Sequence, residues 1–280
     1  MHIWLNGSVE EAAHAHLPAH SAGTLLGWGA FTTLGVWSGR PFALVQHLRR
    51  LRHNAAELGL ELAFTDYELD CALYDVIEAN NVREGLARLT VTARGDGRWN
   101  SAPGSDVSVL AQQHSTTHAP FRPLTLGLSP FRVGVSHALS GLKSTSYAAH
   151  LRAWHTAQRA GWDEAVLLND AKILCETTRA NLFWIKEDVV FTPSLECGPL
   201  PGIARERVLA WCSHLGIVAR EGSYLLSDLH AAEEVFVTAS TTGPRPVARL
   251  VEGTDRSLEA PGPLTQQLMA RWEAAVRDGE

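Results

Sequence analysis

Residues 164–193 read EAVLLNDAKILCETTRANLFWIKEDVVFTP, and this stretch decides the fold class. Short apolar runs rich in β-branched and aromatic residues alternate in it with polar turns, which is typical of antiparallel strands. The pattern predicts one strand pair at 164–169 and 172–176 around the turn Asn169-Asp170, and another at 181–186 and 189–192 around Lys186-Glu187-Asp188. The C-terminal half of the chain is therefore expected to contain a β-sheet.

Helices and one further strand are expected around this sheet region. The predicted elements are a helix at about 145–159 capped by Ser144 or Ser146, a helix from Pro201-Gly202 to Gly216, a last strand at 234–238 and a closing helix at about 263–277. A Gly/Ser-rich segment that contains Lys143 precedes the first of these helices.

The N-terminal half mixes hairpins with amphipathic helices. Its predicted elements are a hairpin at Asn6-Gly7 after a strand at 2–6, a second hairpin of Ala30–Trp37 with Pro41–Val45, helices at 47–60 and 66–80, and strands at 87–94 and 106–111. Residues 112–123 are polar and contain His and Pro, which is typical of a linker. The sequence therefore predicts an α+β protein of two domains, 1–117 and 118–280, each a β-sheet or barrel-like sheet with flanking helices.

Composition excludes several classes of protein. The chain has 280 residues, of which 45% are hydrophobic and 19% charged, and its formal net charge is −6. No basic field is available for nucleic acid or an anionic membrane, and no apolar run approaches the roughly 18 residues that a membrane helix needs. The N-terminus does not resemble a signal peptide, and the four cysteines lack CxxC spacing, so a cytoplasmic location and no metal site are expected.

The chain has lysine only at positions 143, 172 and 186, which makes each of them informative. Lys172 and Lys186 belong to polar turns, where a charge is simply solvated. Lys143 lies among small and apolar residues without a neighbouring acid, and desolvation there would favour the neutral, nucleophilic amine that Schiff-base chemistry uses. The alternative is a partly exposed lysine at the start of a helix.

Three other features are candidates for a site. Glu176 ends an apolar strand and is either a buried carboxylate or a strand end that faces water. The helix that starts after Pro201-Gly202 offers free backbone N–H groups to a phosphate, although most such helix starts bind nothing. The polar stretch 238–243 offers hydroxyl donors or is an ordinary loop.

Taken together, these motifs resemble the class IV aminotransferase family. The resemblance covers residues 3–250 and rests on Gly27-x-Gly29-x-Phe31, His47-x-x-Arg50-Leu51, Lys143-Ser144-Thr145-Ser146-Tyr147, Asp163–Asn169, Glu176-x4-Asn181-Leu182-Phe183, Phe191-Thr192-Pro193 and Leu200-Pro201-Gly202-Ile203-x-Arg205. It implies fold type IV, similar to D-amino-acid aminotransferase, and pyridoxal 5'-phosphate as the cofactor, with the cofactor lysine in the C-terminal domain.

The resemblance also implies residue roles. The lysine that forms the Schiff base falls on Lys143, and the carboxylate that bonds the pyridine nitrogen falls on Glu176. That carboxylate keeps the ring protonated, so that the ring accepts electrons from the substrate Cα. The residues expected to hold the phosphate are Arg50, the N–H groups of Ile203 and Ala204, and Ser240 or Thr241, while Tyr147 is expected near the phenolic oxygen of the cofactor. Arg50 has a structural alternative, because Arg49 and Arg52 flank it.

The family contains both transaminases and aminodeoxychorismate lyases. Phe31-Thr32-Thr33 is similar to the lyases, in which the second Thr assists the chemistry, and Arg98 is similar to an arginine that binds substrate carboxylate. Ala239 stands where many lyases carry Asn, and Trp28 stands between the two glycines where Asp is usual. The Arg-x-His pair of the D-amino-acid enzymes and the Tyr-x-Arg of the branched-chain enzymes are both missing.

The resemblance therefore implies an enzyme that transfers an amino group from an amino acid to a 2-oxo acid through a Lys143 Schiff base. The alternative is a 4-amino-4-deoxychorismate lyase of folate biosynthesis, which releases pyruvate and 4-aminobenzoate. Phe31, Thr33, Arg98 and Ala239 are the candidate substrate-binding residues, and Thr33 has the alternative role of a core-facing strand residue. A homodimer is expected from the family.

Overall fold

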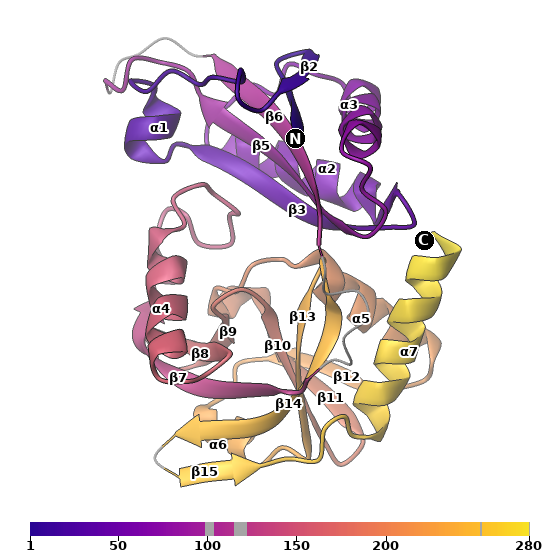
Figure 1. Cartoon of the computed structure of the whole chain (residues 1–280). Helices are drawn as coiled ribbons and strands as arrows, with labels where there is room; N and C mark the ends of the chain where they lie inside the picture. Colours follow the sequence, from indigo (N-terminus) through magenta and orange to yellow (C-terminus); the bar gives the residue numbers. More distant parts are fainter. Residues whose placement is uncertain (99–103, 115–121, 253, 280) are drawn as a thin grey trace. The chain divides into compact units, whose positions relative to one another are not determined.

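The computed structural model describes residues 1–98, 104–114, 122–252 and 254–279, and it divides into two compact units (Figure 1). Unit 1 comprises Met1–Ala119, Leu142–Tyr147 and Gly279–Glu280, and unit 2 comprises Pro120–Gly141 and Ala148–Asp278. The domain boundary predicted at 117/118 lies outside the described residues. The segment around Lys143, predicted for the C-terminal domain, groups with unit 1.

Unit 1 is built on a six-stranded sheet with the strand order β2-β1-β6-β5-β3-β4. The strands are β1 (His2–Leu5), β2 (Ser8–Glu11), β3 (Gly29–Trp37), β4 (Arg40–Pro41), β5 (Gly85–Ala93) and β6 (Ser105–Gln113). The Asn6-Gly7 hairpin is confirmed, and both of its residues have positive φ, as a tight turn requires. The predicted partner strand Pro41–Val45 is wrong beyond Pro41, because α2 begins at Leu44.

One face of this sheet is the hydrophobic core of unit 1. Thr32, Leu89 and Val109 lie in register on neighbouring strands, and all three are fully buried. Helices α2 (Leu44–Glu57) and α3 (Asp66–Ala79) pack on the sheet, α2 against β3 and α3 against β1 and β6, while the short α1 (Ala22–Leu26) contacts β5. Both long helices confirm their predicted ranges to within three residues.

The opposite face of the same sheet carries a different set of side chains. Because successive residues of a strand point to opposite faces, Phe31 and Thr33 of β3 share this second face with their partners on β5, Thr90 and Arg88. Phe31 is buried, whereas the other three are only half-buried. This second face is therefore open enough to offer polar groups to a ligand.

The segment Leu142–Tyr147 pairs with the start of β3. Ser144 forms an antiparallel bridge with Ala30, and Thr145 N donates to Gly29 O at 2.7 Å. The helix predicted from about residue 145 therefore begins three residues later, as α4 (Ala148–Arg159), and neither Ser144 nor Ser146 caps it. The sequence could not reveal this pairing, because it joins residues more than a hundred positions apart.

Unit 2 contains a nine-stranded mixed sheet that curls strongly, so that β7 crosses β10 and β13 in Figure 1. The order is β12-β11-β10-β13-β14-β7-β8-β9, with β15 paired to β14. The strands are β7 (Leu124–Val133), β8 (Glu164–Asn169), β9 (Leu174–Thr177), β10 (Asn181–Lys186), β11 (Val189–Pro193), β12 (Ala219–Gly222), β13 (Glu234–Ala239), β14 (Gly243–Glu252) and β15 (Thr254–Ser257). The two strand pairs predicted at 164–193 are confirmed.

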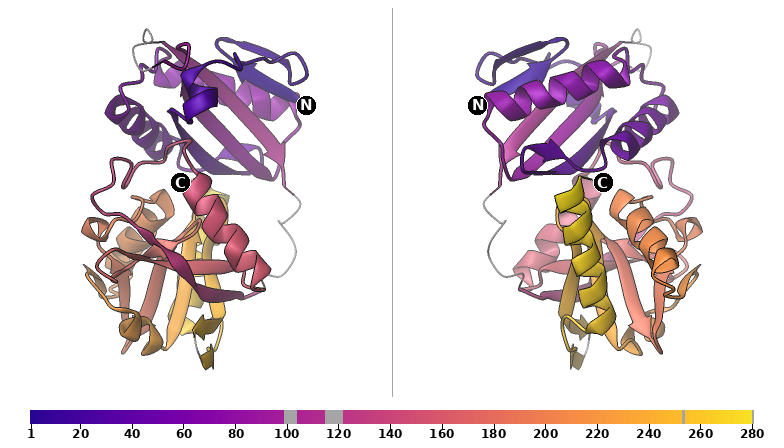
Figure 2. Two further views of the ribbon diagram at one scale, coloured as in Figure 1. Left: turned by 90° about the vertical axis from the view of Figure 1, so that its left-hand side faces the viewer. Right: turned by 90° about the vertical axis from the view of Figure 1, so that its right-hand side faces the viewer.

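Both faces of the central strands of unit 2 are covered. Leu182 and Trp184 of β10 belong to one core cluster, while Phe183 stacks on Phe236 with ring centroids 4.9 Å apart on the other side. The helices are α4, α5 (Ile203–His214), α6 (Leu226–His230) and α7 (Pro263–Asp278), with a short 3-10 turn η1 (Leu195–Cys197). Helix α7 runs along the sheet and packs on β14 (Figure 2).

The prediction that 234–238 is the last strand is wrong, since β14 and β15 follow it. Pro244 and Pro246 argue against a strand in the sequence, because proline cannot donate to a β-ladder. In the structure β14 pairs with β7 only from Val247 onward, so both prolines precede that ladder. Their missing N–H groups therefore cost β14 no hydrogen bond to β7.

Candidate active site

Lys143 is held in place by the backbone of β3. Phe31 N donates to Lys143 O at 2.9 Å, next to the Ala30–Ser144 bridge. This close approach depends on Gly29, where an added Cβ would lie 2.6 Å from the Val91 carbonyl oxygen and 2.8 Å from Thr145 Oγ1. Glycine is therefore required at position 29 of the motif, because a side chain would push the lysine segment away from the sheet.

The amine of Lys143 lies against two aromatic rings. Its Nζ is 4.7 Å from the ring centroid of Phe31 and 3.5 Å from the hydroxyl oxygen of Tyr147. The two rings meet edge to face with centroids 5.3 Å apart. Phe31 and Tyr147, both predicted site residues, are therefore the immediate neighbours of the predicted nucleophile in unit 1.

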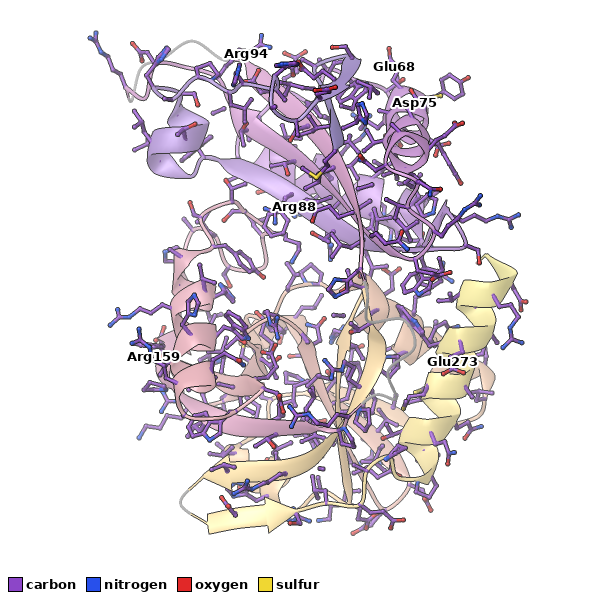
Figure 3. The ribbon with its side chains drawn as sticks, viewed as in Figure 1. Glu68, Asp75, Arg88, Arg94, Arg159 and Glu273 are labelled. Carbon is purple, nitrogen blue, oxygen red and sulfur yellow. The ribbon has the colours of Figure 1, made fainter. Side chains whose placement is uncertain are left out.

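Arg88 lies on the same face of the sheet, and the sequence-based reasoning missed it. Figure 3 labels Arg88 in unit 1. Its guanidinium carbon is 3.7 Å from the ring centroid of Phe31, and its Nε donates to Thr90 Oγ1 at 3.4 Å. Burial lowers the pKa of Arg88. Among the described residues, no carboxylate forms an ion pair with it. In the sequence, Arg88 is noticeable as a charged residue within a strand of alternating apolar residues. In the sheet, it is the register partner of Thr33.

Arg50 belongs to a buried polar group beneath β3. Its NH2 group donates to Thr32 Oγ1 at 3.0 Å, and the same oxygen lies 2.7 Å from His47 Nδ1. Burial, reinforced by the charges of Arg50 and Lys143, holds the pKa of His47 well below its usual range. A neutral histidine is therefore part of the surroundings of Arg50.

Glu176 in β9 is a buried carboxylate, as one of its two sequence-based alternatives required. It is 8% exposed, and its Oε2 accepts a hydrogen bond from Leu200 N at 3.2 Å. Its Oε1 lies 3.7 Å from His150 Nε2 on α4. One carboxylate oxygen is thus fixed by backbone, while the other faces an imidazole.

The start of α5 lies close to this carboxylate in unit 2. Asn181 Nδ2 donates to Leu200 O at 2.9 Å, and Gly202 packs so tightly on Asn181 that an added Cβ would lie 1.9 Å from Oδ1. Gly202 is the N-cap residue and has no side-chain cap, so side chains leave the first N–H groups of the helix, including those of Ile203 and Ala204, unbonded.

The end of β13 meets the same part of the sheet. Thr238 is the register partner of Asn181, and Ala239, Ser240 and Thr241 follow it directly. Thr238 Oγ1 is buried without a hydrogen-bond partner in the described structure. Ala239, Ser240 and Thr241 are half-buried, and the latter two form the turn into β14. Arg98, by contrast, lies in the loop after β5, where its side chain is 86% exposed and 3.5 Å from Asp96.

Known proteins resemble this chain over nearly its whole length. Residues 29–250 match the family "Amino-transferase class IV". A D-alanine aminotransferase from Bacillus licheniformis is 27% identical over 99% of this chain and 97% of its own, and an aminodeoxychorismate lyase from Vibrio harveyi is 27% identical over 95% and 97%. A branched-chain aminotransferase from Thermoproteus uzoniensis has the same fold, with a TM-score of 0.92 at 27% identity over 100% of this chain and 96% of that structure.

The fold and the residue set define an α+β enzyme of fold type IV. The chain belongs to the class IV aminotransferase family, whose members depend on pyridoxal 5'-phosphate. Its relatives include transaminases of two kinds and a lyase, and all of them are enzymes.

The residues of this chain fit that cofactor. Unit 1 supplies an amine beside aromatic rings and a buried guanidinium, and unit 2 supplies a buried carboxylate, an uncapped helix start and an unpartnered buried hydroxyl, that of Thr238. The described residues include no group of three or more His, Cys, Asp or Glu side chains that could hold a metal ion. None of the helices in the described part of the chain is long and apolar enough to cross a membrane.

Proposed function

We propose that this protein is an aminotransferase that uses pyridoxal 5'-phosphate to transfer an amino group from an amino acid to a 2-oxo acid. The observation that carries the proposal is the position of Lys143, whose Nζ lies at the hydroxyl of Tyr147 and above the ring of Phe31. Lys143 would hold the cofactor through its aldehyde group, and its amine would take the proton from the substrate Cα.

The other residues hold the cofactor. Glu176 bonds the pyridine nitrogen, and Tyr147 bonds the phenolic oxygen. The phosphate is held by Arg50, by the N–H groups of Ile203 and Ala204, and by Ser240 or Thr241. When bound, the cofactor supplies an electron sink for the substrate Cα. The hydrogen bond from Leu200 N to Oε2 orients the Glu176 carboxylate, whose other oxygen lies 3.7 Å from His150 Nε2.

Substrate binding is assigned to the second face of the unit 1 sheet and to Ala239. Phe31 and Thr33 line this face beside the lysine, and Arg88 offers a guanidinium to a carboxylate. Arg98, the candidate taken from the sequence, remains a proposal for the same task from the β5–β6 loop. Two arginines suit a substrate with one carboxylate at Cα and another acidic group in its side chain.

The lyase is the second candidate, and the position of Thr33 favours it. Thr33 is half-buried and shares the second face of the sheet with its register partner Arg88, which supports this role. A hydroxyl there is available to move a proton during release of a leaving group. Aminodeoxychorismate lyases are among the relatives that match nearly the full length of the chain.

The test combines two assays on the protein loaded with pyridoxal 5'-phosphate. One arm supplies L- and D-amino acids with 2-oxoglutarate and follows the cofactor spectrum, and the other supplies aminodeoxychorismate and follows 4-aminobenzoate and pyruvate. Conversion of the cofactor to its amino form by one group of amino acids supports the transaminase. Rapid 4-aminobenzoate formation that is lost in Thr33→Ala overturns it in favour of the lyase.

The covalent role of Lys143 has its own control. Lys143→Ala is expected to abolish the absorbance band of the covalently bound cofactor. A band that persists in Lys143→Ala but disappears in Lys172→Ala or Lys186→Ala would reassign the nucleophile, and only these two other lysines exist.

We also infer a cytoplasmic homodimer with one domain boundary near residue 117. All four cysteines are free, which suits a reducing compartment. Leu25, Leu26 and Trp28 form an apolar patch on unit 1, with exposed fractions of 60%, 47% and 44%, and such exposure favours an interface. Sedimentation at several protein concentrations tests the dimer, and Trp28→Asp is the variant expected to weaken it.

A further inference from the structure

We propose that His47 is a positioning residue which, through the hydroxyl of Thr32, fixes the guanidinium of Arg50 in the orientation that holds the cofactor phosphate. The proposal rests on the proposed function, because it takes Arg50 as a phosphate ligand. It adds two residues, His47 and Thr32, that touch neither substrate nor cofactor in this assignment and act through Arg50.

Hydrogen bonds link two side chains of α2 to one side chain of β3. Arg50 and His47 are one helical turn apart on α2, and both face the single oxygen Thr32 Oγ1, at 3.0 Å and 2.7 Å. Thr32 and His47 are fully buried and Arg50 is 9% exposed, so water does not compete for these bonds. A β-branched threonine on a strand has restricted rotamers, which fixes the position of the shared oxygen.

The donor and acceptor groups of these side chains indicate the direction of the hydrogen bonds. An arginine guanidinium only donates, so Thr32 Oγ1 accepts from Arg50. We infer that Thr32 donates its hydroxyl proton to His47 Nδ1, which is the acceptor when the neutral ring carries its proton on Nε2. The depressed pKa of His47, caused first by burial and then by the charges of Arg50 and Lys143, agrees with this neutral state.

A purely structural role would not need these residues. The surroundings are the apolar core between α2 and the sheet, where Leu48 and Leu51 are buried on the same helix. Burying a histidine and a threonine there costs free energy, and His47 Nε2 has no partner among the described residues. We infer that this cost is compensated because the hydrogen bond to Thr32 keeps the remaining N–H groups of the Arg50 guanidinium in one orientation.

The experiment compares two non-covalent ligands that differ only in the phosphate, pyridoxine 5'-phosphate and pyridoxine, on the full-length protein. The readout is the dissociation constant of pyridoxine divided by that of pyridoxine 5'-phosphate, each measured by quenching of tryptophan fluorescence. Thr32→Val and His47→Leu are expected to lower this ratio about tenfold by weakening the phosphorylated ligand alone, since a hydrogen bond to a charged group has about that effect. A general loss of structure would weaken both ligands and leave the ratio unchanged.

Conservative variants provide the rescue. Thr32→Ser keeps the hydroxyl and His47→Asn keeps an acceptor near Nδ1, so both are expected to retain most of the wild-type ratio. If His47→Leu fails to fold, Thr32→Val still tests the proposal, because valine has nearly the same shape as threonine but no hydroxyl. Wild-type ratios in Thr32→Val and in folded His47→Leu would overturn the proposal.

Arg50→Gln separates this inference from the proposed function. If Arg50→Gln leaves the ratio unchanged, Arg50 is not a phosphate ligand and the assignment beneath the inference fails. If Arg50→Gln collapses the ratio but Thr32→Val does not, the phosphate site stands and the positioning role of His47 is wrong.

Discussion

Arg88 is a cation that, like the Lys143 amine, lies over the ring of Phe31, and it has no carboxylate partner among the residues that the structure describes. Its guanidinium stacks on Phe31, and its Nε finds only the hydroxyl of Thr90. A half-buried charge of this kind is costly unless a ligand completes it. We propose that this ligand is a substrate carboxylate, because arginine binds carboxylates through two parallel hydrogen bonds.

We therefore expect Arg88→Gln to lower kcat/KM for the substrate by about 10- to 100-fold, the effect of losing a charged hydrogen bond. Steady-state kinetics and the cofactor spectrum are the measurements, and the spectrum should not change. Arg83→Gln is the control, because Arg83 lies just before β5 and is exposed. Equal kinetics for Arg88→Gln and Arg83→Gln would contradict a role for Arg88 in substrate binding.

The lowered pKa of His47 predicts that the free energy of unfolding depends on pH. Its pKa is lowered in the fold by burial first, so below its ordinary pKa of about 6.5 the unfolded chain takes up a proton that the folded chain refuses. The free energy of unfolding should therefore fall as the pH drops below about 6.5, by at most about 1.4 kcal/mol per pH unit from this residue.

Urea unfolding at pH 7.5 and pH 5.5 measures this difference, and His47→Asn should reduce it. Asparagine does not titrate and keeps an acceptor for Thr32, so the comparison isolates the proton. A wild-type pH dependence in His47→Asn would show that other groups cause it.

At the scale of single residues, the sequence predicted what is local and missed what depends on neighbouring strands. Lys143 is conspicuous because lysine is so rare in the chain, whereas Glu176 was left open between a buried carboxylate and a strand end that faces water, and the structure shows the first. Arg88 was missed because its importance comes from facing Thr33 and stacking on Phe31, and both contacts depend on the pairing of β3 with β5.

At the scale of elements, the periodic segments and the hairpins within 164–193 were predicted well, and the pairings between distant segments were not. Helix α3 illustrates the first case, because Thr65 and Glu68 form a capping box that is visible in the sequence. The segment 142–147 illustrates the second. Its Ser and Thr residues resemble a helix cap, yet Thr145 Oγ1 and Ser146 Oγ both donate to Gly27 O, at 2.7 Å and 2.9 Å.

Gly29→Ala tests whether this pairing holds Lys143. The new methyl group would press on Val91 O and Thr145 Oγ1, and overpacking of this kind costs roughly 1–3 kcal/mol. We expect lower stability and, in addition, slower covalent attachment of pyridoxal 5'-phosphate, since the lysine segment moves away from β3. Stopped-flow absorbance measures that attachment rate.

Gly59→Ala is the matched control for Gly29→Ala. Gly59 is also in unit 1, but it has a φ of +66° with open space around it, so alanine strains the backbone there without touching the site. If the two variants lose stability but attach the cofactor at the same rate, the packing of Gly29 does not position Lys143.

At the scale of the whole molecule, each unit has a core of its own. Unit 1 closes one sheet face with α2 and α3, and unit 2 buries both faces of β10 and β13. The sequence predicted an α+β chain of two parts, and the fold class is confirmed. The boundary at 117/118 stays a prediction, and the transfer of the Lys143 segment to unit 1 could not be read from chain order.

The four cysteine thiols differ in exposure between the two units. Cys71 on α3 is exposed, whereas Cys175, Cys197 and Cys212 of unit 2 are buried, with exposed fractions of 1%, 3% and 0%. Burial raises the pKa of Cys175 and raises that of Cys212 to about 11, so neither offers a thiolate at neutral pH. The native protein should therefore react with Ellman's reagent at one thiol, and Cys71→Ser should remove that reaction.

In increasing urea, the three thiols of unit 2 should become reactive together, because Cys175, Cys197 and Cys212 lie in one compact unit and a domain core unfolds cooperatively. Mass spectrometry of the Cys71→Ser protein after brief labelling counts them at each urea concentration. A population with all or none of the three labelled supports a single cooperative core. Chains labelled only at Cys212 on α5 would instead mean that α5 detaches before the sheet opens, and the start of α5, assigned here to the phosphate, would then be the weakest part of the unit.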